Sequence, residues 1–262
     1  MNEMFRMVKT EIWKLKRYHV IWAGVFLMLL SVLLTLFSTT AMDGTVWTFP
    51  FFVEQVIKNN VTMIFPMCIA LIAGYIIARE GKDDTLKSIM TIPVSYSSLL
   101  WGKLLVCALL SLLFGLVSAV FTIIADLMMG FPGLSAQVAV QTFVQIILNC
   151  LFLYIAVMPI IAFAARIPSG HMIGTIIAFV YGYGGMFASG NATLANVYPV
   201  TASLGLIHYR SYDSAIHWNA LICLFSMAVA LLVSAVFVFT AKGNAPVKTV
   251  KKRKKSATKK GW

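Results

Sequence analysis

Six long apolar segments constrain this chain more than any other feature of its sequence. About 20 mostly apolar residues are needed to cross the hydrocarbon core of a bilayer, so we expect each segment to be a membrane-spanning helix. The predicted spans cover about 19–37, 61–78, 104–128, 140–165, 172–188 and 220–241. Because 60% of all residues are hydrophobic and only 11% are charged, too few polar groups remain to cover a soluble globule. The sequence therefore predicts an all-α integral membrane protein with six transmembrane helices.

The distribution of charge predicts how these helices are oriented. A formal net charge of +12 is typical of a nucleic-acid binder, but the basic residues are not spread evenly along the chain. Nearly all Lys and Arg fall in the two termini or in the loop 79–103, and only Lys58 and Arg210 fall on the other side. The positive-inside rule then places both termini and that loop in the cytoplasm, which explains the charge without nucleic acid.

A single membrane domain, 1–241, is expected to precede a basic cytoplasmic tail, 242–262. The tail is rich in Lys and has few apolar residues, so we expect it to be disordered. Two roles stay open for it: it anchors the topology, or it also binds anionic lipid.

The segment 2–17 alternates charged and apolar residues with helical periodicity. Trp13 belongs to its apolar side, whereas Lys14 and Arg17 belong to the polar side. We expect a helix that lies flat on the cytoplasmic leaflet. A signal peptide is the competing interpretation, but the following apolar run is long enough to span and more spans follow.

The loop 79–103 is the longest charged interruption between two apolar segments. Its carboxylates at 83 and 84 can cap a short helix that ends before Pro93. Within it, Leu86, Ile89 and Met90 share one face by their i, i+3, i+4 spacing. This apolar face can lie on lipid or fill a groove in a partner protein.

The chain lacks the common sequence motifs for catalysis and metal binding. Gly102-Lys103 has no upstream glycine and is followed by Leu, so it is not a P-loop. The chain has no HExxH or GxSxG motif, and its four histidines fall at span ends or in loops, so we expect no metal site and no catalytic residues. The four cysteines all lie in apolar segments without CxxC spacing and are expected to be small core residues.

Few polar side chains fall within the predicted spans. Asp126 is near the outer end of the third span, where it is either a functional acid or an acid exposed to water at the outer surface. Gln141, Gln145 and Asn149 share one face of the fourth span and suit a helix–helix seam. The spacing of Gly170 and Gly174 likewise favours close helix packing, which we prefer to a role in helix flexing.

Several motifs together resemble those of a transporter family. They are Glu11-xx-Lys14-Leu15-Lys16-Arg17 in the amphipathic helix, Glu80-xxxx-Thr85-Leu86, Pro93-Val94-Ser95 and Gly102-Lys103. With six spans, they resemble the type 2 permeases of ATP-binding-cassette (ABC) exporters, and most of all the bacitracin-resistance and lantibiotic self-immunity branch. The chain departs from the family pattern at Asp84, where glycine is common, and at Tyr96, where arginine is common.

The resemblance implies a division of labour in a bacterial cytoplasmic membrane. This chain would pair with a second permease chain, either identical or related, and with two copies of a cytoplasmic ATPase that bind ATP and Mg²⁺. No cofactor is expected on this chain itself. The short helix in the loop would be the coupling helix that contacts the ATPase, and the residues implied in coupling are Glu80, Asp84, Thr85, Leu86, Ile89, Met90 and Pro93.

The family suggests an amphiphilic antimicrobial peptide as the substrate. Asp43, Glu54 and Asp126 would attract a cationic peptide, although solvated acids beside an ordinary aromatic belt explain the same residues. Two other classes of function stay open, a secondary carrier that works without an ATPase, and an intramembrane enzyme or passive assembly protein. The absence of acids near the middle of the spans disfavours the carrier, and no nucleophile and base are evident for the enzyme.

Overall fold

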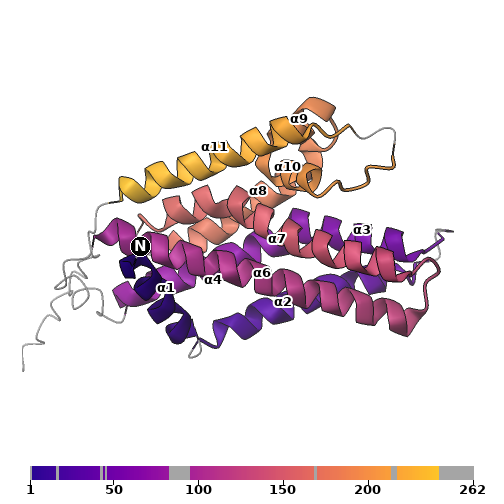
Figure 1. Cartoon of the computed structure of the whole chain (residues 1–262), viewed down its shortest axis with the longest axis horizontal. Helices are drawn as coiled ribbons and strands as arrows, with labels where there is room; N and C mark the ends of the chain where they lie inside the picture. Colours follow the sequence, from indigo (N-terminus) through magenta and orange to yellow (C-terminus); the bar gives the residue numbers. More distant parts are fainter. Residues whose placement is uncertain are drawn as a thin grey trace, which may run out of the picture.

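The computed structural model describes residues 2–15, 18–41, 44, 46–82, 95–167, 170–213 and 217–241, and every regular element within these ranges is helical (Figure 1). The elements are α1 (Asn2–Leu15), α2 (Val20–Ser38), α3 (Phe49–Asn59), the π-helical turn η1 (Asn60–Ile64), α4 (Phe65–Lys82), α6 (Tyr96–Met129), α7 (Ala136–Ala164), α8 (Gly170–Ala188), α9 (Ala192–Val197), α10 (Pro199–Leu206) and α11 (Ala220–Phe239).

Six of these helical segments are long and apolar enough to cross a membrane, counted over the described part of the chain. They are Val20–Ser38, Phe49–Arg79, Tyr96–Met129, Ala136–Ala164, Gly170–Ala188 and Ala220–Phe239. The predicted all-α fold with six spans is therefore confirmed. In Figure 1 these helices run along the bundle, whereas α1 lies across one end of it. We call the end that carries α1 the α1 end, and the end formed by α3, α9 and α10 the far end.

The second span begins earlier than predicted. The sequence predicts a start at about residue 61, because Glu54 and Lys58 make the preceding segment polar. Residues 49–59 nevertheless form α3, which continues through η1 into α4. The hydroxyl of Thr48 caps α3, and Pro50 stands in its first turn, where a proline is tolerated. Phe49, Phe52 and Val56 on its inner face are buried, so packing overrides the two charges.

The charged loop is shorter than predicted, because both flanking helices extend into it. α4 continues to Lys82, and α6 begins at Tyr96, where the Ser95 hydroxyl accepts a hydrogen bond from the Ser98 amide at 3.1 Å. Lys103, which we placed at the end of the loop, therefore lies two turns inside α6. The predicted coupling helix falls within 83–94, outside the described residues.

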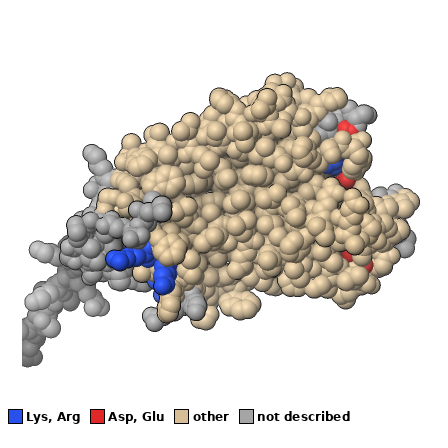
Figure 2. Space-filling model, in the orientation of Figure 1, with Lys and Arg blue, Asp and Glu red and all other residues tan. Residues whose placement is uncertain are grey.

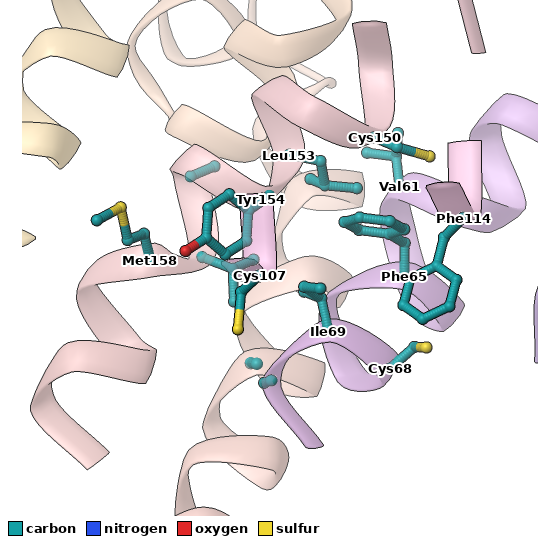
Figure 3. Packing of buried hydrophobic residues seen from close by; sticks show 14 of the residues in the cluster. Val61, Phe65, Cys68, Ile69, Cys107, Phe114, Cys150, Leu153, Tyr154 and Met158 are labelled. Carbon is teal, nitrogen blue, oxygen red and sulfur yellow. The ribbon is translucent and has the colours of Figure 1, made fainter. Parts of the chain in front are cut away.

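The middle of the bundle is a continuous apolar core between α4, α6 and α7 (Figure 3). Phe65, Phe114 and Tyr154 are among its largest fully buried side chains. The Tyr154 hydroxyl donates to the Leu104 carbonyl at 2.7 Å, which satisfies its polar group inside the core. All four cysteines are free and buried, as the sequence predicted.

The π-helical turn η1 lies where α8 packs against the second span. Pro66 has no amide hydrogen, so it cannot donate to the Thr62 carbonyl four residues earlier, and a wider turn accommodates this. Gly182 on α8 allows the close approach, since a Cβ there would lie 2.9 Å from the Thr62 carbonyl oxygen and 2.8 Å from Pro66 Cγ. The break between α3 and α4 is therefore packed tightly by α8.

The polar segment 189–217, between the last two predicted spans, also contains structure that the sequence does not predict. It forms α9 and α10, and α10 packs on α7 and α11. Residues 200–205 of α10 are buried, although Thr201 and Ser203 are polar. Pro199 at the start of α10 favours a new helix after the turn at Tyr198.

Candidate functional site

The charged side chains of the described residues gather at the two ends of the bundle (Figure 2). In this view, Lys and Arg cluster near α1, and Asp and Glu are visible at the far end. The long apolar middle separates the two groups. Each end has its own ion-pair network, and each network contains a glutamate paired with a basic residue distant in the sequence.

At the α1 end, Lys103 of α6 forms an ion pair with Glu11 of α1 at 3.0 Å. Both residues are only 2% exposed. Lys103 Nζ also donates to the Ile76 carbonyl of α4 at 3.4 Å, and Lys14 contacts the other Glu11 oxygen at 2.6 Å. We call Glu11, Lys14, Ile76 and Lys103 the α1 joint, because they tie α1, α4 and α6 together.

The electrostatics of the joint favour the charged form of Glu11. Burial by itself opposes a carboxylate, but the charges and hydrogen bonds of Lys103 and Lys14 outweigh it and hold the pKa of Glu11 below its ordinary value. Next to the joint, the guanidinium of Arg79 lies 4.4 Å from the ring centre of Tyr18, a cation–π contact between α4 and the α1–α2 turn. Gly102 faces α1 as well, because a Cβ there would meet Met7 Cβ at 3.5 Å.

The joint connects two motifs that the sequence could only treat separately. Glu11 and Gly102-Lys103 were both part of the family resemblance, and the structure shows that they are partners in space. Of the predicted interfacial residues, Trp13 is exposed and Lys14 pairs with Glu11, whereas Arg17 lies outside the described residues. The predicted coupling residues from Asp84 to Pro93 also lie outside them, as does the side chain of Glu80.

At the far end, Glu54 of α3 is the centre of a second network. The Tyr212 hydroxyl donates to its carboxylate, and the Arg210 Nε lies 3.5 Å from its Oε2. Arg210 also pairs with Asp213 at 3.1 Å. Tyr209 donates its hydroxyl to the Glu54 backbone carbonyl at 3.1 Å, and burial raises the pKa of that tyrosine, so it stays a donor. The chain after α10 is thus fastened to α3.

Beside this network lies a cavity of about 400 Å³. Its walls come from α3 and η1, the end of α8, α9, α10 and the segment after α10. The residues that line it are Gln55, Lys58, Val61, Thr62, Gly185, Met186, Ser189, Gly190, Ala192, Ala195, Thr201, Leu204, Tyr209, Arg210, His217 and Trp218. The sequence did not predict this site, because residues far apart along the chain form it and share no motif.

The three predicted outer-face acids have different surroundings. Glu54 is in the network just described, while Asp43 lies outside the described residues. Asp126 is 1% exposed, so the interpretation of an acid exposed to water is wrong. It lies in the last turn of α6, next to a small apolar cluster that includes Phe52 of α3 and Ala125 of α6.

The predicted seam residues lie on the side of α7 that faces α10, with one exception. The Gln145 amide donates to the Ile207 carbonyl at 3.0 Å, and the Ser203 hydroxyl donates to Asn149 Oδ1 at 3.4 Å. Gln141 is exposed. Gly170 and Gly174 both approach Ala164 closely, where an added Cβ would lie 2.2 Å from its oxygen and 2.6 Å from its Cβ, respectively.

Comparison with known proteins gives two matches. A family model described as an ABC-2 family transporter protein matches residues 7–185, which include most of α1 and extend into α8. The bacitracin transport permease protein BCRB of Bacillus licheniformis is 35% identical over 91 residues. That match covers 35% of this chain and 44% of the relative, so it spans less than half of the relative's length.

Proposed function

This chain belongs to the ABC-2 family of transporter proteins, and from that membership we propose that it is the membrane permease subunit of an ABC exporter. The resemblance drawn from its motifs is confirmed by the family match, and the match to the bacitracin permease agrees with the predicted branch. Its six apolar helices make it a multi-pass protein of the cell membrane. The family match over 7–185 is the single observation that carries the proposal.

In this proposal, a separate cytoplasmic ATPase hydrolyses ATP and the loop after α4 receives its motion. The α1 joint supports such a role, because it fixes the end of α4 and the beginning of α6, the two helices that the loop connects. A movement of the loop would therefore be transmitted to both helices and to α1 together. The predicted short helix, with Leu86, Ile89 and Met90 on its apolar face, would sit in a groove of the ATPase.

The proposed substrate is an amphiphilic antimicrobial peptide such as bacitracin or a lantibiotic. This part rests on the similarity to the bacitracin permease and is therefore a proposal about substrate class. The proposed assembly contains two permease chains and two ATPase chains. Both termini and the loop are proposed to face the cytoplasm, in accordance with the excess of Lys and Arg at the α1 end.

Copurification tests the coupling. A tagged chain expressed with its candidate ATPase should retain that partner, and Leu86→Asp or Ile89→Asp should abolish retention because each buries a charge in an apolar groove. Ser88→Asp is the matched control, since helical periodicity places Ser88 opposite Leu86. Full retention by the Leu86 and Ile89 variants would rule out this helix as the contact.

Resistance tests the substrate class. Sensitive cells that express the chain together with the ATPase should survive higher concentrations of bacitracin or a lantibiotic than cells that express the chain alone. Equal protection by the chain alone would favour a carrier that needs no ATPase. No protection against any amphiphilic peptide by the complete pair would contradict the proposed substrate class.

A further inference from the structure

The charged side chains that line the far-end cavity are all basic. Lys58 and Arg210 both line it, and they are the two Lys or Arg residues that the described chain places at this end. His217 also lines it, and no Asp or Glu does so within the described residues. The positive-inside rule explains basic residues at the α1 end but not the two at the far end. That Lys58 and Arg210 line the same cavity therefore calls for another explanation.

The acids nearby hold one of these cations in place. Glu54 and Asp213 contact Arg210 at 3.5 Å and 3.1 Å, but neither acid lines the cavity. Lys58 is exposed, and the described residues provide no ion-pair partner for it. The cavity therefore has one fixed cation and one available cation facing the same space.

The remainder of the wall is largely apolar. Val61, Met186, Leu204 and Trp218 contribute hydrophobic surface, and the Trp218 indole is held by a 2.7 Å hydrogen bond from its Nε1 to the Tyr209 carbonyl. Four uncharged polar residues also line the cavity, Gln55, Thr62, Ser189 and Thr201. The hydroxyls of the last three donate to carbonyls three or four residues earlier, so their oxygens face the cavity as acceptors. A wall of this kind suits a ligand with a charged head and an apolar body.

The backbone maintains this shape. Val61 and Thr62 belong to the π-helical turn η1, which α8 fixes through the close approach at Gly182. Gly185, one turn further along α8, lies at the cavity itself. The cavity is therefore built on two packed helices and does not depend on a surface loop alone.

We propose that the far-end cavity binds an amphiphile with a negatively charged headgroup, which Lys58 and Arg210 contact while the apolar body lies against Val61, Met186 and Trp218. This site is independent of the coupling to an ATPase. The shared chemistry of its ligands is a phosphate or carboxylate next to an apolar chain. A free anion is the alternative source of the charge, and the experiment separates the two.

The test uses the purified full chain in nanodiscs of phosphatidylcholine, to which brominated phosphatidylglycerol is added in steps. Bromine quenches indole fluorescence at short range, so we measure the part of the quenching that Trp218→Phe removes. We expect this part to reach half its maximum at a mole fraction several-fold lower for brominated phosphatidylglycerol than for brominated phosphatidylcholine. Inorganic phosphate alone should not reverse it.

Charge variants identify the contact. Lys58→Gln should raise the half-quenching mole fraction of phosphatidylglycerol about 3- to 10-fold, the range expected for losing one charge-assisted contact. Lys58→Arg should retain the wild-type value. Lys9→Gln is the matched control, since it removes an exposed lysine at the opposite end of the bundle.

Three results would overturn the proposal. They are equal half-quenching by the two lipids, no difference between Lys58→Gln and Lys9→Gln, and reversal by inorganic phosphate, which indicates a site for free anions. Native mass spectrometry provides a second measurement that does not depend on Trp218. The wild-type chain should retain bound phosphatidylglycerol after detergent exchange, and Lys58→Gln should retain less. Equal retention would also contradict the proposal.

Discussion

The α1 joint and the far-end network both contain an ion pair with a glutamate, but the two ion pairs have different roles. Each pairs a glutamate with a basic residue from a distant part of the chain. The Lys103 side chain in the joint is 2% exposed, whereas the Arg210 side chain is 39% exposed beside a cavity. The joint is therefore a sealed link that fixes helices, and the far-end network shapes a surface that a ligand can reach. Burial, more than the type of residue, decides which role a pair serves.

The largest expected effect comes from breaking the sealed pair. Lys103→Met leaves Glu11 buried with Lys14 as its one charged partner among the described residues, and removing one member of a buried pair costs about 3–5 kcal/mol. We expect a large loss of thermal stability in detergent. Combining it with Glu11→Gln should recover much of the loss, since no unpaired charge is then buried. A single variant as stable as wild type would show that the joint does not depend on charge.

A pair of glycine substitutions compares the packing at the two ends. Gly182→Ala places its Cβ 2.9 Å from the Thr62 carbonyl, a backbone atom that cannot move away easily, so we expect a loss of about 1–3 kcal/mol. Gly102→Ala is the matched control at the α1 end, where the nearest atom is 3.5 Å away. It should be neutral or gain up to about 1 kcal/mol from helix propensity. Equal melting temperatures for the two variants would contradict the tight packing at η1.

Breaking the exposed pair should have a smaller effect on stability. Arg210→Gln removes two ion pairs, at 3.5 Å with Glu54 and at 3.1 Å with Asp213. The arginine is 39% exposed, and each pair of this kind contributes at most about 1 kcal/mol. Tyr212 still donates to Glu54 in this variant. The melting temperature in detergent checks the prediction. A loss as large as that of Lys103→Met would mean that the two ends do not differ as we describe.

The smallest expected effect is a loss of the stability contributed by Glu11 at acid pH. The pKa of Glu11 is held below its ordinary value of 4.5, so its contribution to stability is complete above about pH 4.5 and is lost as the pH falls through the lower pKa of the folded state. We therefore expect the difference in melting temperature between wild type and Glu11→Gln to stay constant near neutral pH and to narrow below 4.5. A difference that already narrows well above this pH would indicate a raised pKa instead.

The sequence predicted the parts of the fold that depend on local pattern. Apolar length predicted the six spans, and alternation of charge predicted α1. The sequence predicted that the second and third spans start later than they do, at 61 and 104 instead of 49 and 96. Charged residues such as Lys58 and Lys103 are typical of loops when their contacts are unknown. An ion pair or the packing of a neighbouring helix stabilises the helical conformation at such residues. These partners are distant in the sequence, so a short stretch of sequence does not reveal them.

The functional regions were harder to predict for the same reason. Glu11 and Lys103 are 92 residues apart, and Glu54 and Tyr212 are 158 apart. Either glutamate has many possible basic or hydroxyl partners in the sequence. Motif resemblance identified both halves of the α1 joint without pairing them, and nothing in the sequence marked His217 or Trp218 as neighbours of Lys58.

The π-helical turn also sets the angular register of everything before it. Successive residues of an α-helix are rotated by about 100°, so one residue more or less in η1 would turn the whole of α3 by that angle relative to α4. Lys58 would then point away from the cavity, and Glu54 would leave Tyr212. Deleting Met63, which does not line the cavity, would thus rotate α3 relative to α4 without removing any of the side chains that form the cavity wall.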